Sequence, residues 1–204
     1  MKVMVRILEE LDASKTYSFA DYLAWQFVDR VELLWGKLMK MSMPSVQHQD
    51  ASGKIFVIFA KYLEHKKCKV FHPPFDVRLP KINELADNQI HTVVQPDIVV
   101  LCDLSKLDKK GCLGAPDLVV EILSNSTSRR DLKDKFYLYE TAGVREYWIV
   151  EPNTGYVIQY QLGGESKYIQ NGIFAKGDLM TSGVFPDLVV TISDIFDEEL
   201  SNLG

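Results

Sequence analysis

The sequence lacks any apolar run long enough to cross a membrane, and its first segment, MKVMVRILEELDASKTYSF, lacks the apolar core of a signal peptide. Cysteine is scarce, because Cys68, Cys102 and Cys112 are an odd number without the spacing of a metal site. From these absences we expect a cytoplasmic protein, with no membrane partner, whose cysteines are reduced and structural.

The chain also lacks a basic excess, an internal repeat and a Pro-, Gly- or Ser-rich linker. Its formal net charge of −5 argues against a protein that simply coats nucleic acid, although it permits an enzyme that keeps acidic groups for a metal. The 204 residues are 47% hydrophobic and 25% charged, which is typical of a globular chain with a sizeable core. We therefore expect a single domain over residues 1–204.

The apolar pattern of the first half predicts helices and then strands. Ser18 is suited to cap a helix that reaches about Phe27. VELLWGKLMK predicts a strand pair that turns near Trp35 and Gly36. A longer helix with a broad apolar face is expected over about 45–65. The strands expected after it are 69–71, 75–79, 93–102 and 117–123.

In the second half, the pattern predicts one inserted helix followed by more strands. The helix covers about 130–142, and Gly143 is suited to its C-terminal end. REYWIVEP and YVIQYQL predict a hairpin, and KYIQNGIF and FPDLVVTI add late strands. This order differs from the regular alternation of a doubly wound fold. The expected class is α/β in the broad sense, an α+β chain with a central mixed β-sheet flanked by helices and additional β-hairpins.

One carboxylate, Glu121, interrupts the apolar strand in GAPDLVVEILSNSTSRRDLKDK. Strand residues alternate between faces, so Glu121 should share a face with Val119 and Leu123. If the strand is central, Glu121 is removed from bulk water, which is costly unless the carboxylate is ion-paired, hydrogen-bonded or bound to a cation. From this strand alone, a structural salt bridge and a functional site are both open.

A second carboxylate follows a similar pattern in QPDIVVLCD, where Asp97 comes after a proline and before an apolar strand. Neighbouring strands can bring Asp97 close to Glu121, and two close carboxylates repel each other unless a hard divalent cation lies between them. Asp117 and Asp187 also follow prolines, so the pattern is equally compatible with a turn or capping role.

The helix after this strand carries two candidate cations. At ~100° per residue Leu132 and Tyr139 lie on its buried face, and Lys135 lies about 60° from Leu132, at the edge of that face. Lys133 lies about 100° away on the other side. Lys135 is therefore the better candidate to reach a carboxylate, and Asp131 can orient it from four residues earlier. The alternative is a surface lysine in an ordinary ion pair.

Three segments carry a resemblance to a known family: VELLWGKLMKMSMPSVQHQ, VVQPDIVV and GAPDLVVEILSNSTSRRDLKDKFYLYETAGVREYWIVEP. They resemble the Uma family, which is named for restriction endonucleases and belongs to the PD-(D/E)XK nuclease superfamily. The similarity runs from about Ser18 to about Phe196, and its most specific part is 114–152. It implies a restriction-endonuclease-like core and a metal-dependent enzyme that hydrolyses phosphodiester bonds.

The resemblance also implies a site. Asp97 matches the first aspartate of the motif and Glu121 its second acidic residue. Together with the backbone carbonyl of Ile122, they would hold Mg²⁺ or Mn²⁺. The third motif position, which normally holds lysine, is Leu123 in this chain. In this family the lysine role passes to the following helix, which here points to Lys135.

Two further residues match the family outside that motif. Glu32, in VELLWGKL, matches an acidic residue that adds a metal ligand; its alternative is an exposed strand residue balancing Arg30 or Lys37. His48, in PSVQHQ, matches a histidine at the start of the long helix; its alternative is a hydrogen bond to a loop carbonyl.

The loop between the Glu121 strand and the Lys135 helix is rich in hydroxyl and guanidinium groups. These groups and the helix N-terminus are suited to bind phosphate oxygens, and the alternative is a solvated helix start. The candidate substrate-binding residues are Ser124, Ser126, Thr127, Arg129 and Arg130.

The first functional hypothesis is an endodeoxyribonuclease that acts, as a homodimer, on duplex DNA with an activated water. A second hypothesis keeps the fold but makes the protein an inactive nucleic-acid-binding or interaction module, which Leu123 and the acidic net charge favour. A third keeps the metal and changes the substrate of the phosphodiesterase to RNA.

Overall fold

The structure is a computed structural model, and it describes residues 4–6, 8, 11–81, 83–124 and 129–196. The chain divides into two compact units. The first comprises Met1–Met43, Pro74–Gln95 and Ser105–Ala115, and the second comprises Pro44–Pro73, Pro96–Leu104 and Pro116–Gly204. A single domain over 1–204 stays a prediction.

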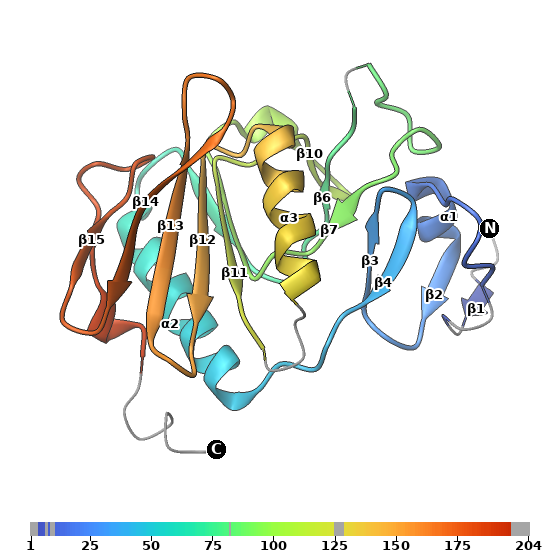
Figure 1. The fold of residues 1–204 in the computed structure, drawn as a ribbon. Helices are drawn as coiled ribbons and strands as arrows, with labels where there is room; N and C mark the ends of the chain where they lie inside the picture. The colour runs from blue at the N-terminus through green and yellow to red at the C-terminus, as the bar shows by residue number, and fades with distance from the viewer. Residues whose placement is uncertain (1–3, 7, 9–10, 82, 125–128, 197–204) are drawn as a thin grey trace. The chain divides into compact units, whose positions relative to one another are not determined.

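The second unit is built on a six-stranded sheet (Figure 1). Its strands are, in order across the sheet, β14 (Tyr168–Ala175), β13 (Tyr156–Leu162), β12 (Glu146–Glu151), β11 (Leu118–Ile122), β8 (Ile98–Leu101) and β5 (Lys69–Phe71). β11 and β12 are parallel, and the other neighbours are antiparallel. The sheet is therefore mixed, which confirms the expected fold class.

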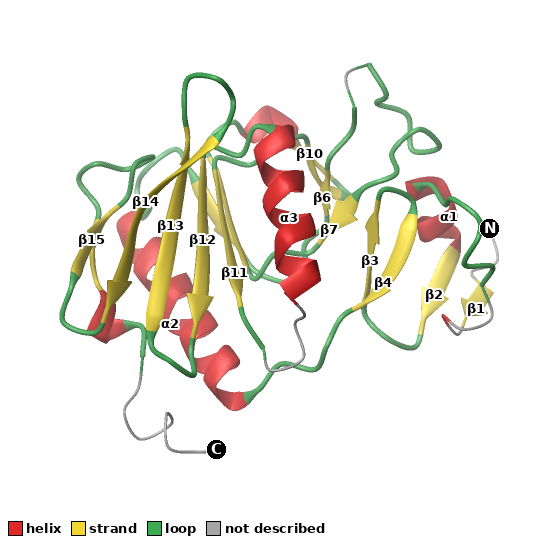
Figure 2. Ribbon diagram, viewed as in Figure 1, coloured by secondary structure: helices red, strands yellow, loops and turns green. Residues whose placement is uncertain are grey.

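Helices α2 (Val46–Tyr62) and α3 (Arg129–Ala142) cover opposite faces of this sheet (Figure 2). Ile55 and Phe59 of α2 share one apolar cluster with Val120, whereas Tyr139 of α3 contacts Glu121, which points to the other face. The same α2-side cluster includes residues of β15 (Leu179–Thr181), β16 (Val189–Thr191) and the short helix η3 (Ile192–Asp194). Every residue of β11 is consequently buried.

The first unit has its own six-stranded sheet and a small core. The strands are, in order, β4 (Lys37–Lys40), β3 (Val31–Leu34), β7 (Val93–Val94), β6 (Val77–Arg78), β10 (Gly111–Leu113) and β9 (Leu107–Asp108). The other elements are α1 (Phe19–Ala24), the parallel pair β1 (Met4–Arg6) and β2 (Trp25–Phe27), and η2 (Leu104–Lys106), which begins at the unit boundary. The core contains Phe19, Leu33, Ile90 and Val93.

The predicted starts of the helices agree with the structure, whereas the predicted end of α1 does not. Ser18 caps α1 in a capping box with Asp21, as expected, but the helix ends at Ala24 instead of Phe27. The residues after it form β2, because they pair with β1. The turn near Trp35 is confirmed between β3 and β4. None of the helices in the described ranges is long and apolar enough to cross a membrane.

The strand expected over 93–102 is in fact two strands. β7 pairs within the sheet of the first unit, β8 pairs within the sheet of the second, and Gln95–Asp97 lies between them. Pro96 has no N–H to donate to a ladder, which favours a break at this point. The break leaves Asp97 immediately before β8, outside the regular ladder.

The expectation of reduced cysteines is wrong for two of the three. β5 and β8 pair antiparallel with Lys69 opposite Leu101, so the next residues outward, Cys68 and Cys102, face each other. They form a disulfide, whereas Cys112 is a buried thiol outside that disulfide. The odd number of cysteines had suggested that none forms a disulfide. The disulfide depends on which strands lie side by side, and this is a property of the tertiary structure.

We predict that a digest prepared without reductant contains a linked Cys68–Cys102 peptide by mass spectrometry. Reduction should lower the free energy of unfolding by about 2 to 4 kcal/mol, since the link closes a loop with a sequence separation of 34. The Cys112→Ser variant is the control and should keep both the linked peptide and the sensitivity to reductant. Alkylation of all three cysteines without prior reduction would contradict the disulfide.

Candidate active site

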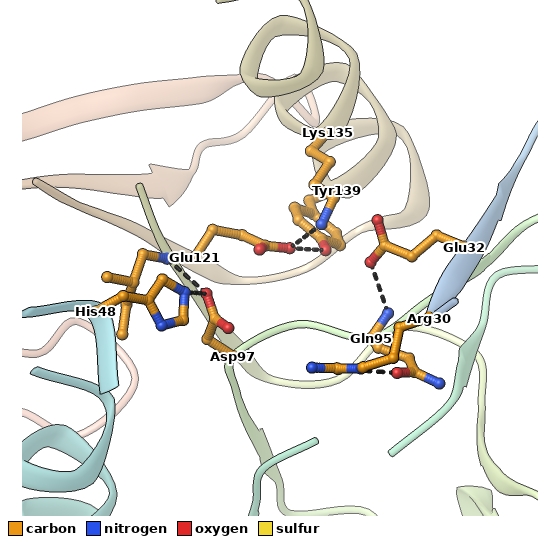
Figure 3. A network of polar contacts seen from close by, with 9 residues as sticks. Arg30, Glu32, His48, Gln95, Asp97, Glu121, Lys135 and Tyr139 are labelled. Carbon is orange, nitrogen blue, oxygen red and sulfur yellow. Dashed lines mark hydrogen bonds and ion pairs between the residues drawn. The ribbon is translucent and has the colours of Figure 1, made fainter. Parts of the chain in front are cut away.

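Glu121 lies on β11 and points toward α3, where two side chains donate to the same carboxylate oxygen (Figure 3). Lys135 Nζ lies 2.9 Å from Glu121 Oε1, and Tyr139 Oη lies 2.6 Å from it. The side chains of Glu121 and Lys135 are only 10% and 13% exposed. The charge on the strand is thus compensated by a cation and by a hydroxyl from one side of α3.

Asp97 is held beside the end of β11 by the antiparallel pairing of β8 with that strand. Ile98 lies opposite Val120, so the residue before Ile98 lies close to the C-terminal end of β11. There the backbone N–H of Ile122 donates to Asp97 Oδ2 at 2.8 Å. Asp97 is therefore hydrogen-bonded to the residue that directly follows Glu121.

His48, in the first turn of α2, contacts the same oxygen of Asp97. Ser45 caps this helix and accepts the backbone N–H of His48 at 3.1 Å, which fixes the position of the histidine. The Nε2 atom of His48 lies 3.1 Å from Asp97 Oδ2, and the two side chains are 11% and 14% exposed (Figure 3). Sequence reasoning had offered a loop carbonyl as the alternative partner, and the structure places a carboxylate there instead.

Glu32 belongs to the first unit, on β3. Glu32 is only 5% exposed, so the alternative prediction, that it is an exposed strand residue, is wrong. Its Oε1 atom accepts the backbone N–H of Gln95 at 2.8 Å, and Gln95 precedes Asp97 by two residues in the chain.

The two candidate lysines of α3 have different surroundings. Lys135 reaches Glu121, as its position at the edge of the buried face had suggested. Lys133 is exposed, and its Nζ atom lies 6.0 Å from the ring centroid of Tyr137. Of these two lysines, Lys135 is the one in contact with a predicted site carboxylate.

The sequence of the chain matches known proteins. The sequence model of the Uma2 family, described as "Putative restriction endonuclease", matches residues 19–193. The chain belongs to this family. Among curated proteins, "Uncharacterized protein slr1290" from a Synechocystis strain is 28% identical over 121 residues, which is 58% of this chain. The match covers 60% of that relative's own length.

A solved structure shows the same fold. The crystal structure of "a putative nuclease belonging to DUF820" from Anabaena variabilis has a TM-score of 0.69 with 16% sequence identity. The match covers 87% of this chain and 96% of that one. Membership of the Uma2 family and a nuclease-like fold together support a nuclease.

The predicted phosphate-binding loop of this Uma2 protein is described only in part. Ser124 lies just after β11. Ser126 and Thr127 lie outside the described residues, and so do the side chains of Arg129 and Arg130 on α3 and of Asp131, the expected partner of Lys135. Their predicted roles stay predictions.

Asp117, a further Pro-Asp residue, has a structural role at the start of β11. Its Oδ2 atom accepts the backbone N–H of Cys102 at 2.7 Å, and its Oδ1 atom accepts from Arg145 at 3.1 Å. These contacts reach residues 15 and 28 positions away, so they differ from the local turn role that the sequence had suggested. Asp117 and Asp97 therefore have different partners in spite of their shared local pattern.

Two contacts of the candidate site were not expected from the sequence. Sequence reasoning placed Tyr139 on the buried face of the helix but gave its hydroxyl no partner, and it assigned the carbonyl of Ile122 a role while overlooking its N–H. The signal for Tyr139 was available, because it follows Lys135 by four residues and so lies on the same side of α3. The N–H of Ile122 had no signal, since its partner depends on how β8 pairs with β11.

A second buried glutamate shows how a structural carboxylate is satisfied in the same sheet. Glu146, at the start of β12, is 0% exposed. Four neutral groups donate to it at 2.6 to 2.8 Å: the side chains of Trp148, Gln159 and Ser182 and the N–H of Val184. Glu121 differs because a lysine ammonium takes part in its compensation.

We predict that Lys135 and Glu121 are energetically coupled in the metal-free protein. Removing one member of a buried ion pair leaves the other charge uncompensated, so a double-mutant cycle with Lys135→Met and Glu121→Gln should give a coupling energy of about 1 to 3 kcal/mol. Urea unfolding of the four proteins in EDTA measures it. Lys133→Met is the matched control and should change stability by less than about 0.5 kcal/mol. A coupling energy of zero would refute the pairing.

Proposed function

We propose that this chain is a metal-dependent endonuclease that hydrolyses phosphodiester bonds of DNA with an activated water. The observation that carries the proposal is the placement of Asp97 and Glu121. Two carboxylates lie at the ends of adjacent strands, joined through the N–H of Ile122, with the ammonium of Lys135 on Glu121. Family membership and fold support the nuclease part of this proposal.

The donor set suits a hard divalent cation. Among the described residues, no group of three or more His, Cys, Asp and Glu side chains is arranged to hold a metal. Mg²⁺ needs no such group, because it is usually bound by one or two carboxylates and keeps several waters or substrate phosphate oxygens. Asp97, Glu121 and the carbonyl of Ile122 are therefore the proposed ligands for Mg²⁺ or Mn²⁺.

When bound, such an ion lowers the pKa of a water molecule and offsets negative charge on the scissile phosphate. The residues of the chain supply orientation and fixed charge. The N–H of Ile122 and the ring of His48 both contact Oδ2 of Asp97 and restrict the orientation of this carboxylate. Lys135 presents a cation beside Glu121, where it can stabilise charge that develops on the phosphate. Because Leu123 occupies the position where the motif usually has lysine, the proposed positive charge is that of Lys135 on α3.

Other parts of the proposal rest on the sequence. The family resemblance suggests Glu32 as a further ligand, and the nuclease hypothesis includes a homodimer on duplex DNA. The lack of a signal peptide suggests a cytoplasmic location. The hydroxyl and guanidinium groups of the loop suggest phosphate binding by Ser124, Ser126, Thr127, Arg129 and Arg130. The alternatives are an inactive nucleic-acid-binding module and an RNA-specific phosphodiesterase. The same cleavage experiment separates these alternatives from the main proposal.

We predict Mg²⁺- or Mn²⁺-dependent cleavage of plasmid DNA that is lost on chelation with EDTA. Asp97→Ala and Glu121→Gln should each lower the rate by about 100-fold or more, because each removes a proposed metal ligand. Asp117→Asn is the matched control, since it changes a Pro-Asp carboxylate outside the site and should retain cleavage. Gel assays with plasmid, duplex oligonucleotide and RNA measure the activity.

Two results would count against the proposal. If wild type and Glu121→Gln behave identically on all substrates and with both metals, the chain is not a nuclease of this type. If only RNA is cleaved, the hydrolase part holds and the DNA part is wrong.

A further inference from the structure

The hydroxyl of Tyr139 is the shortest contact described for Glu121. It donates to Glu121 Oε1 at 2.6 Å, whereas Lys135 Nζ lies at 2.9 Å from the same oxygen (Figure 3). The residue is 0% exposed, so this hydrogen bond is shielded from water. A short hydrogen bond to an ionised acceptor is among the stronger kinds in proteins.

The ring of Tyr139 is held by other aromatic side chains, which fixes the position of its hydroxyl. It packs against Tyr147, with ring centroids 5.1 Å apart. Tyr147 stacks in turn with Tyr160 at 6.3 Å and with Tyr168 at 6.0 Å. A tyrosine in such packing has little rotational freedom, whereas lysine is a point charge on a flexible stem. Of the two donors to Glu121, the tyrosine is therefore better suited to set the direction of the carboxylate.

Tyr147 provides an internal comparison. It is also 0% exposed, yet its hydroxyl has no hydrogen-bond partner in the part of the chain that the structure describes. Burial, with a smaller contribution from the charge of Glu121, raises the pKa of Tyr147 well above its usual range, so this hydroxyl stays protonated. The two buried tyrosines pack against each other but differ in their hydroxyl contacts, since Tyr139 donates to Glu121 and Tyr147 donates to no described group.

We infer that Tyr139 is a positioning residue that holds the carboxylate of Glu121 in the orientation in which it binds the divalent metal. This inference rests on the proposed function. Groups that hydrogen-bond to a metal-ligating carboxylate fix its geometry, and removing one typically costs about 10- to 100-fold in metal affinity or activity. The alternative is a purely structural role, in which Tyr139 hydrogen-bonds to the buried carboxylate of Glu121 and affects the stability of the fold but not metal binding.

The test compares Tyr139→Phe with Tyr147→Phe, because each change removes one buried hydroxyl and keeps the ring. Mn²⁺ binding is measured by titration calorimetry without DNA, and DNA cleavage is measured as a function of Mn²⁺ concentration. We expect Tyr139→Phe to weaken Mn²⁺ binding by about 10- to 100-fold and to recover much of its cleavage rate at saturating Mn²⁺. Tyr147→Phe should match wild type in both measurements.

A second background makes the comparison specific to Glu121. Tyr139→Phe should weaken Mn²⁺ binding much less when Glu121→Gln is already present, because the hydroxyl then has no carboxylate to orient. An equal effect in both backgrounds would assign the loss to general packing and overturn the inference.

The remaining outcomes are also decisive. If wild type binds Mn²⁺ and cleaves DNA while Tyr139→Phe binds Mn²⁺ equally well, the inference is wrong and the proposed function stands. If wild type neither binds Mn²⁺ nor cleaves, the proposed function fails and the inference fails with it. A Tyr139→Phe protein without a cooperative unfolding transition would make the hydroxyl a requirement of the fold and would also overturn the inference.

Discussion

The arrangement of the candidate site depends on the burial of Glu121 on β11. β11 lies inside a six-stranded sheet with α2 on one face and α3 on the other, so its carboxylate has little access to water. A buried charge of this kind must be compensated by partners placed within hydrogen-bond distance. The packing of α3 on the sheet provides them, since Lys135 and Tyr139 both point at Glu121.

The strand β8 is the second element that the site requires. Its start carries Asp97, which the N–H of Ile122 and His48 hold, and its end is followed by Cys102, which the disulfide to Cys68 holds. A strand fixed at both ends leaves the adjoining Asp97 carboxylate little freedom, which favours a preorganised arrangement of side chains. The capped first turn of α2 then places His48 against this strand.

The two buried glutamates of the sheet show how different environments lead to different roles. Glu146 is satisfied by four neutral donors from β12, β13 and the segment around β15, so it joins elements of the fold. Glu121 is satisfied by a cation and a hydroxyl from a single helix. Leu123 stands at the motif's lysine position, and on α3 Lys135 contacts Glu121, whereas Lys133 lies near the ring of Tyr137.

Local patterns in the sequence were enough to predict the class of the fold and the starts of its helices, and to propose Asp97 and Glu121 as site carboxylates. These depend on local periodicity, on capping residues such as Ser18 and Ser45, and on the cost of a charge within an apolar strand. Only the tertiary structure decided that 93–102 is two strands, that Cys68 faces Cys102, and that Ile122 and Tyr139 hydrogen-bond to the carboxylates. Pro96 and the four-residue spacing of Lys135 and Tyr139 are local signals for two of these features. Such signals do not identify the partner of a residue, because that depends on which strands pair and on how a helix packs on them.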